Sequence, residues 1–116
     1  MYTANSPKEL KKLIEEGKSP IYTTDPKTIK VIEALESLKT KGVVETAKDE
    51  IKEVFLKILI GVARPIGLIS ETTTIILVGM SLATLIALYA TYKNRSTKIK
   101  YRTDKKGKPE VEIEIE

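Results

Sequence analysis

The sequence predicts a mostly helical fold that ends in a β-hairpin. Two charged amphipathic segments with helix-capping residues come first, an uncharged run follows at residues 72–92, and alternating charged and apolar residues close the chain. We expect a charged helical region at 1–50, a hydrophobic helical hairpin at 51–93 and a charged β-hairpin at 94–116. The central region would pair one strongly hydrophobic helix with a preceding amphipathic helix, in a membrane or in the core of an assembly.

The composition excludes several kinds of chemistry. The chain has 116 residues, the length of one domain, and contains neither Cys nor His. Disulfides, thiolate metal sites and the commonest general base are therefore absent. We expect no enzymatic activity, no cofactor, no metal and no small-molecule substrate. The wealth of Lys, Glu and Ile, with few thermolabile residues, is typical of a thermophilic source.

The first helix is framed by clear signals. Ser6 is a suitable N-cap, Pro7 a suitable first residue, and Glu9 completes a capping box. Gly17 should end the helix. The stretch at residues 20–24 has the composition of a short strand and could pair at the edge of a sheet.

The second helix should begin after the Asp25 cap with Pro26, and Lys41-Gly42 should end or kink it. A third helix is expected from about Val44, because apolar residues recur at helical spacing. These residues are Ala47, Ile51, Val54, Phe55, Ile58, Leu59 and Val62.

The run at residues 72–92 is long enough to cross a bilayer as one helix, which takes roughly 20 residues. Tyr89 and Tyr92 stand where an interfacial aromatic belt belongs. Lys93 and Arg95 follow directly and could bind lipid headgroups, which would place the C-terminal side in the cytoplasm.

The segment before this run leaves two topologies open. Residues 54–69 are largely apolar but include Lys57 and Arg64, so their insertion is close to break-even. We favour a helical hairpin that turns near residues 65–72, with both termini cytoplasmic. Arg64 could then pair with Glu71 inside the membrane. A single span preceded by an amphipathic interfacial helix is the alternative.

The uncharged helix also predicts self-association. Gly79, Ala83 and Ala87 recur every four residues, and small residues at this spacing let two helix backbones approach closely. A helix that is apolar on all sides could instead lie at the centre of a protein filament or shell. Both readings require other copies of the chain, so the chain itself and a lipid bilayer are the expected partners.

The tail should form a hairpin with a loop at about residues 104–108. If Tyr101 faces Val111, oppositely charged residues meet on one face and fix the register. The expected pairs are Lys98–Glu114, Lys100–Glu112 and Arg102–Glu110. Because these cations already have acidic partners, we do not expect nucleic acid as a partner.

In layout, the apolar residues 51–92 resemble the two-hydrophobic-helix coat proteins of archaeal spindle-shaped viruses, which pack around lipid. The order of helices followed by a charged hairpin is similar to small accessory components of prokaryotic defence systems. We therefore expect a non-enzymatic, membrane-inserted structural or scaffold protein that assembles through its hydrophobic helices. The alternatives are a coat or shell protein of a virion or filament, and a pore-forming holin-like or defence effector component.

Overall fold

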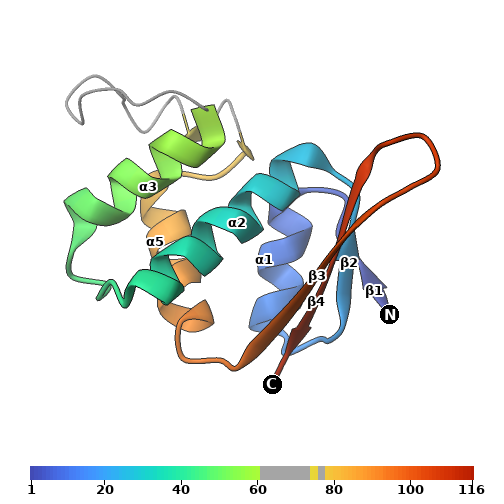
Figure 1. Ribbon diagram of the computed structural model, residues 1–116. Coiled ribbons are helices and arrows are strands. Elements are labelled where there is room, and N and C mark those ends of the chain that lie inside the picture. Colours follow the sequence, from blue (N-terminus) through green and yellow to red (C-terminus); the bar gives the residue numbers. More distant parts are fainter. Residues whose placement is uncertain (61–73, 76–77) are drawn as a thin grey trace.

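The computed structural model describes residues 1–60, 74–75 and 78–116. Within these residues it contains four helices and a four-stranded sheet, so the fold is mixed α/β. The helical part and the C-terminal hairpin are both present (Figure 1). The elements in chain order are β1 (Tyr2–Thr3), α1 (Pro7–Glu15), β2 (Ile21–Thr23), α2 (Pro26–Lys41), α3 (Lys48–Ile60), α5 (Leu82–Tyr92), β3 (Thr97–Thr103) and β4 (Pro109–Ile115).

The sheet joins the two ends of the chain. Its strand order is β1-β2-β4-β3, with β1 parallel to β2 and the other neighbours antiparallel. Helix α1 makes the crossover that two parallel strands require. The expected strand at residues 20–24 is therefore present as β2, but it lies inside the sheet, whereas the sequence favoured an edge position.

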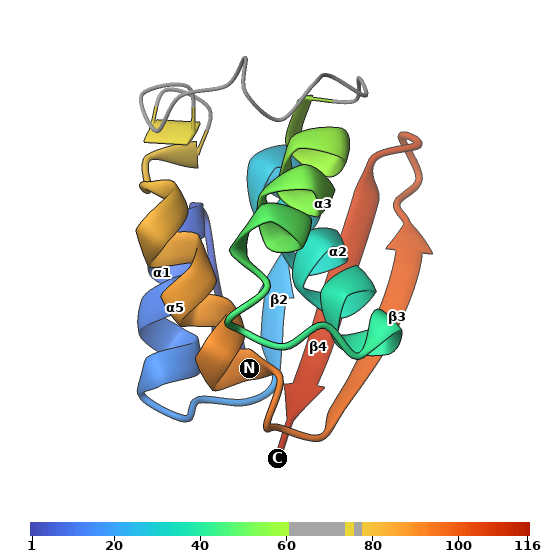
Figure 2. The same cartoon turned by 90° about the vertical axis from the view of Figure 1, so that its left-hand side faces the viewer.

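The helices all lie on one side of the sheet. Figures 1 and 2 show α1 and α2 next to the strands, with α3 and α5 on the side of these helices that is remote from the sheet. Contacts of α2 with β4, and of α5 with α1, α2 and α3, agree with this layering. None of the helices in the described part of the chain lies on the other face of the sheet (Figure 1).

The predicted helix caps are confirmed. The Ser6 hydroxyl accepts a hydrogen bond from the Glu9 N–H at 3.2 Å, and the Asp25 carboxylate accepts one from the Thr28 N–H at 3.0 Å. Gly42 ends α2 in a left-handed conformation, with φ of 70°, which glycine adopts without strain. Helix α3 begins at Lys48, four residues after the expected start.

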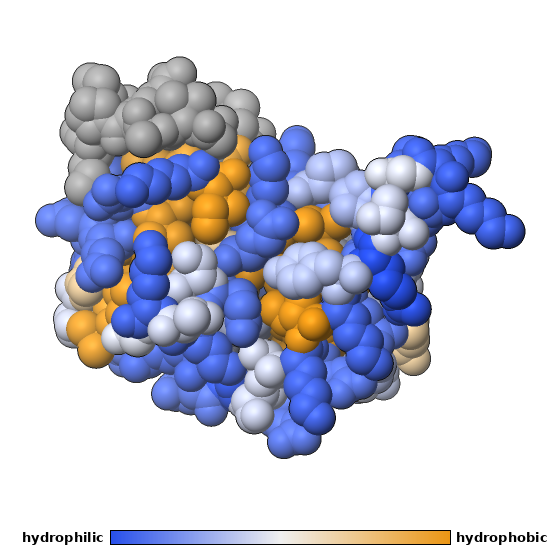
Figure 3. All heavy atoms as spheres, in the orientation of Figure 1, coloured by the Kyte–Doolittle hydropathy of each residue, from blue (hydrophilic) through white to orange (hydrophobic). Residues whose placement is uncertain are grey.

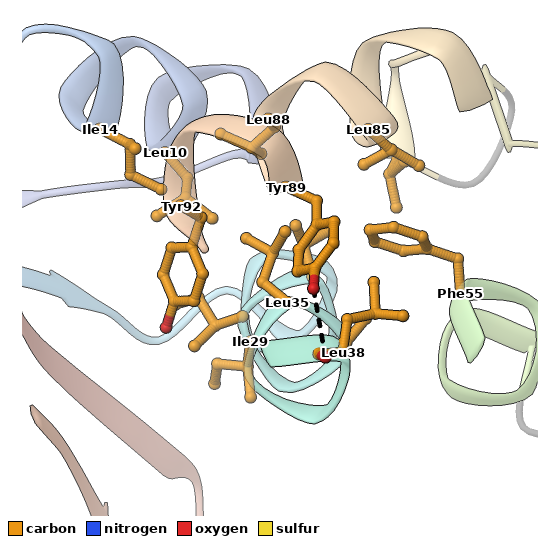
Figure 4. Packing of buried hydrophobic residues seen from close by; sticks show 14 of the residues in the cluster. Leu10, Ile14, Ile29, Leu35, Leu38, Phe55, Leu85, Leu88, Tyr89 and Tyr92 are labelled. Carbon is orange, nitrogen blue, oxygen red and sulfur yellow. Dashed lines mark hydrogen bonds between the residues drawn. The ribbon is translucent and has the colours of Figure 1, made fainter. Parts of the chain in front are cut away.

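The core lies between the sheet and the helices. Val111, Ile113 and Ile115 of β4 turn towards α2 and are at most 7% exposed. Figure 4 shows the second part of this core, where Leu85, Leu88 and Tyr89 of α5 point into the space between the helices. Leu85 faces Phe55 of α3, and Tyr89 faces Leu38 of α2. The helices thus cover the apolar side of β4, which lies between β2 and β3 in the sheet, whereas Tyr101 of β3 remains 57% exposed.

The expectation of one continuous helix over residues 72–92 is wrong. Gly79 has a φ of 73°, which interrupts a right-handed helix, and Ser81 then caps a new helix. The Ser81 hydroxyl accepts a hydrogen bond from the Thr84 N–H at 3.1 Å. The helix that ends at Tyr92 therefore has only 11 residues, and the chain itself buries its inner side.

None of the described helices combines the length and the apolar composition that crossing a bilayer demands. Residues 61–73 and 76–77 lie outside the described part of the chain. The expected turn near residues 65–72 and the expected pair between Arg64 and Glu71 both fall there, and so they stay predictions.

Candidate interaction surfaces

The buried polar side chains of the described residues all have hydrogen-bond partners. No group of three or more acidic side chains in this part of the chain could hold a metal ion. The polar groups inside the fold are therefore engaged with one another, and the surfaces remain as the candidates for function.

One polar cluster joins α2 to the start of the hairpin. The Tyr92 hydroxyl and the Thr97 hydroxyl both donate to the Glu36 carboxylate, the latter at 3.2 Å. Lys39 Nζ donates to the Thr97 hydroxyl at 3.0 Å and to the Arg95 carbonyl. Burial raises the pKa of Tyr92 far above its ordinary value, and the Glu36 carboxylate adds to the rise. This cluster fixes β3 against α2, a structural role.

Tyr89 links α5 to the C-terminal end of α2. Its hydroxyl donates to the carbonyls of Val43 and, at 3.2 Å, of Leu38 (Figure 4). These are carbonyls at and just beyond the end of α2, where intrahelical partners are lacking. Burial raises the pKa of Tyr89, which is only 1% exposed. Tyr89 and Tyr92 are therefore core residues here and do not form an interfacial belt in this structure.

The outward side of α5 is free of charge. We call its side chains the α5 ridge: Ala83, Ala87 and Thr91 are exposed, and Leu82, Ile86 and Ala90 are half-buried. Helix α5 contacts both α1 and α3, and Figure 2 shows it in front of α1 and beside α3. A groove of about 580 Å³ separates it from α1, and one of about 400 Å³ separates it from α3.

Charged residues line the outer sides of these grooves. On the α1 side they are Lys8, Lys11, Lys12 and Glu15. On the α3 side they are Lys48, Asp49 and Lys52. The surface thus has an uncharged centre with a charged rim, the arrangement of a protein interface.

The structure separates the three small residues that the sequence groups together. Ala83 and Ala87 lie on the α5 ridge, whereas Gly79 precedes the helix and lines the groove beside α1. The backbone at Gly79 requires a positive φ of 73°, which disfavours any residue with a Cβ. Gly79 thus sets the backbone conformation before α5 and does not share a helix face with Ala83 and Ala87.

Replacing Gly79 by Ala should lower the free energy of unfolding by about 1–2 kcal/mol, because an L residue is strained in this conformation. Chemical denaturation followed by circular dichroism would measure the change. Gly79→Asn is the matched control, since Asn tolerates a positive φ better and should cost less. Equal and negligible effects of both substitutions would show that the helix continues through this position.

The two basic residues expected at lipid headgroups contact protein groups. Lys93 Nζ lies 2.5 Å from a Glu45 carboxylate oxygen, and this contact lowers the pKa of Glu45. Arg95 Nε donates to the Glu116 carbonyl at 2.9 Å. Lys93 therefore ties α5 to the segment before α3, and Arg95 ties the hairpin base together. Lipid binding by either residue stays a prediction.

The hairpin has the register that charge alternation predicts. Tyr101 lies opposite Val111. The opposed charged residues are Lys98 and Glu114, Lys100 and Glu112, and Arg102 and Glu110. Ion pairs form at the centre, where Glu112 lies 3.7 Å from Lys100 Nζ and 3.6 Å from an Arg102 nitrogen.

The tip of the hairpin projects beyond β2 in Figure 1, and Figure 3 shows it as a largely hydrophilic projection from the body of the molecule. The pairing of β2 with β4 reaches only to Val111, so the last part of the hairpin is two-stranded. Asp104 holds the turn, because its carboxylate accepts hydrogen bonds from the N–H groups of Lys106 and Lys108 at 2.8 Å each.

The sheet exposes one long edge. β3 is the outer strand, has seven residues and pairs only with β4 in the described part of the chain. The sequence alone does not single out this edge. A hairpin has two outer edges, one on β3 and one on β4. Only the tertiary pairing of β4 with β2 shows that the edge of β3 is the one that stays free.

The described residues thus form a small α/β protein with two candidate interaction surfaces, the α5 ridge and the free edge of β3. The chain matches no protein-family model, no curated protein and no solved structure. The surfaces themselves therefore carry the functional inference.

Proposed function

We propose that this chain is a non-enzymatic structural protein that assembles with copies of itself through the α5 ridge. The observation that carries the proposal is the contrast between α5 and its neighbours. No side chain of α5 is charged, although charged residues make up 31% of the chain. Helices exposed to water normally carry their charged side chains on the outward side, as α1 does.

The shape of this surface suits a second helix. Ala83 and Ala87 are small and exposed, so a facing helix could approach closely at these two positions. Half-buried Leu82 and Ile86 would gain further burial in such a contact. The grooves on both sides of α5 give a partner ridge a place to pack, which is how helices commonly interlock. A two-fold pairing of α5 with α5 meets all three conditions.

The rims of the surface make this assembly dependent on salt. Lysines outnumber acidic residues along both grooves. Two copies that bring their ridges together also bring these rims closer, and like charges repel. Salt screens such exposed charges. Self-association should therefore become tighter as the ionic strength rises.

Replacing both Ala83 and Ala87 by Glu should weaken self-association at least about tenfold, because uncompensated charges would be buried at the centre of the contact. Sedimentation equilibrium over a range of protein concentrations measures this change. Thr24→Glu adds a charge at an exposed position outside both grooves and should leave the association constant unchanged. A wild-type protein that stays monomeric at every concentration and salt level would refute the proposal.

We also propose that the assembly forms against lipid, as the apolar composition of residues 51–92 indicates. An uncharged helix face is compatible with acyl chains as well as with another protein. A carbonate wash of membranes from expressing cells tests this location. Retention in the pellet supports insertion, and release with the oligomer intact supports an assembly free of lipid, such as a shell or filament. Dye leakage from liposomes would favour the pore-forming alternative.

A further inference from the structure

The free edge of β3 presents a regular row of backbone groups. Asp104 N–H donates to the Lys108 carbonyl at 2.8 Å, and Glu116 N–H donates to the Ser96 carbonyl at 2.9 Å. These two pairs lie in register with the even-numbered residues of β3, and every second pair of an antiparallel ladder exchanges hydrogen bonds. The odd-numbered residues therefore turn their N–H and C=O groups to the free edge. They are Thr97, Ile99, Tyr101 and Thr103.

Side chains on the two faces of β3 form two distinct rows. Lys98, Lys100 and Arg102 project from the face that carries no helix, and all three residues are exposed. Ile99 is half-buried and Tyr101 is 57% exposed on the helix side. A strand added beside β3 would thus meet cations on one face and apolar surface on the other.

A second copy of β3 does not fit this edge. Antiparallel pairing centred on Lys100 would place Lys100 opposite Lys100, and Lys98 opposite Arg102. Like charges directly across two strands destabilise the pairing. Cationic side chains on an edge strand are a common protection against such self-pairing. The edge therefore favours a strand of different composition.

We propose that the free edge of β3 binds an extended polypeptide segment of a partner protein in which acidic residues alternate with apolar residues. The added segment would extend the sheet by main-chain hydrogen bonds, and its side chains would supply the specificity. The chain already contains one strand of this composition, because β4 places glutamates opposite the cations of β3 and apolar residues on the other face. On the helix-free face, the cations of β3 would then lie between two rows of acidic side chains, one from β4 and one from the added segment.

A polypeptide fits this edge better than a nucleic acid does. The edge offers donors and acceptors in alternation, and a peptide strand matches both. A phosphate backbone brings acceptors alone, so the outward carbonyls of β3 would remain without partners. Glutamates of β4 also lie beside the cations, and Glu112 contacts two of them. These glutamates would repel a polyanion whose charges are not spaced like the residues of a strand.

The test uses the full chain and a fluorescently labelled peptide with the sequence of residues 109–116, PEVEIEIE. Fluorescence anisotropy should show saturable binding that weakens as salt is added. Amide hydrogen exchange should show new protection at the outward N–H groups of Thr97, Ile99, Tyr101 and Thr103. A control peptide in which every Glu is replaced by Lys should bind at least about tenfold more weakly, because each charge pair becomes repulsive.

Two variants locate the site. Tyr101→Pro removes an N–H that faces the free edge and leaves the ladder with β4 intact, so binding should be lost. Tyr101→Thr keeps this N–H and should retain most of the binding. Replacing Lys98, Lys100 and Arg102 together by Gln should weaken binding roughly tenfold through the lost charge pairs. Unchanged unfolding transitions show that a variant still folds.

Four outcomes would overturn the proposal. They are equal binding of the lysine peptide, equal binding of a single-stranded oligonucleotide, no binding of the acidic peptide by the folded protein, and loss of amide protection in β4. The last outcome would mean that the peptide replaces β4 and does not add beside β3. Since salt should weaken this binding but strengthen association through the α5 ridge, either proposal can fail without the other.

Discussion

Replacing Leu85 by Ala should lower the free energy of unfolding by about 2–5 kcal/mol, the range for a buried leucine whose loss leaves a cavity. Leu85 has no exposed surface and lies beside Phe55 of α3, as Figure 4 shows. Its burial is entirely within one chain. Denaturation by guanidinium chloride, followed by circular dichroism at several protein concentrations, would measure the loss.

The contrast with the outer side of α5 makes this experiment specific. Ala87→Ser changes an exposed position of the same helix and should alter the free energy of unfolding by less than about 0.5 kcal/mol. A small effect of Leu85→Ala, or one that appears only as the protein concentration rises, would contradict the structure. It would mean that Leu85 is buried by lipid or by other subunits, as a continuous apolar helix over 72–92 would require.

The helices of the first half of the chain could be predicted because their boundaries are local. Ser6 and Asp25 accept hydrogen bonds from N–H groups three residues ahead, and each is followed by Pro at the first helical position. Gly42 supplies the left-handed residue at the end of α2. Such caps depend on a few neighbouring residues, so the sequence alone determines them.

The uncharged run was harder to interpret for a physical reason. A helix with charged residues on one side reveals its outward face, whereas residues 72–92 have no charged residues to mark either face. Length and hydropathy then favour a membrane span. The only local sign of the helix break is Ser81, whose hydroxyl can accept a hydrogen bond from the N–H of Thr84 and so cap a new helix. A single serine in an apolar run is a weak signal.

The sheet shows the same division between local and distant causes. The register of β3 and β4 follows from alternating charges within 19 residues, from Thr97 to Ile115, and could be predicted. The pairing of β2 with β4, however, joins residues some 90 positions apart. Strand β1 has only two residues and is defined by its parallel pairing with β2. Only the tertiary packing therefore shows that β3 keeps a free edge.

The buried tyrosines make the protein sensitive to alkali. Tyr92 has no exposed surface and Tyr89 only 1%, and burial raises the pKa of both above the ordinary value of 10.0. Above about pH 10 the unfolded chain loses these protons while the folded protein keeps them. The stabilising contribution is therefore complete below pH 10 and declines as the pH rises towards the folded pKa. For Tyr92, whose pKa is raised far above 10.0, the decline is about 1.4 kcal/mol per pH unit.

Tyr92→Phe should therefore make the alkaline decline in the free energy of unfolding less steep, by about 1.4 kcal/mol per pH unit between roughly pH 10.5 and 12. At neutral pH the variant should be about 1 kcal/mol less stable, because it loses the hydrogen bond to Glu36. All other groups are the same in both proteins, so the difference in slope isolates Tyr92. Tyr2→Phe, at a position 41% exposed, is the control for removing a tyrosine hydroxyl by itself. Parallel curves for wild type and Tyr92→Phe would show that Tyr92 ionises equally in the folded and unfolded states, which a tyrosine packed between α2 and β3 cannot do.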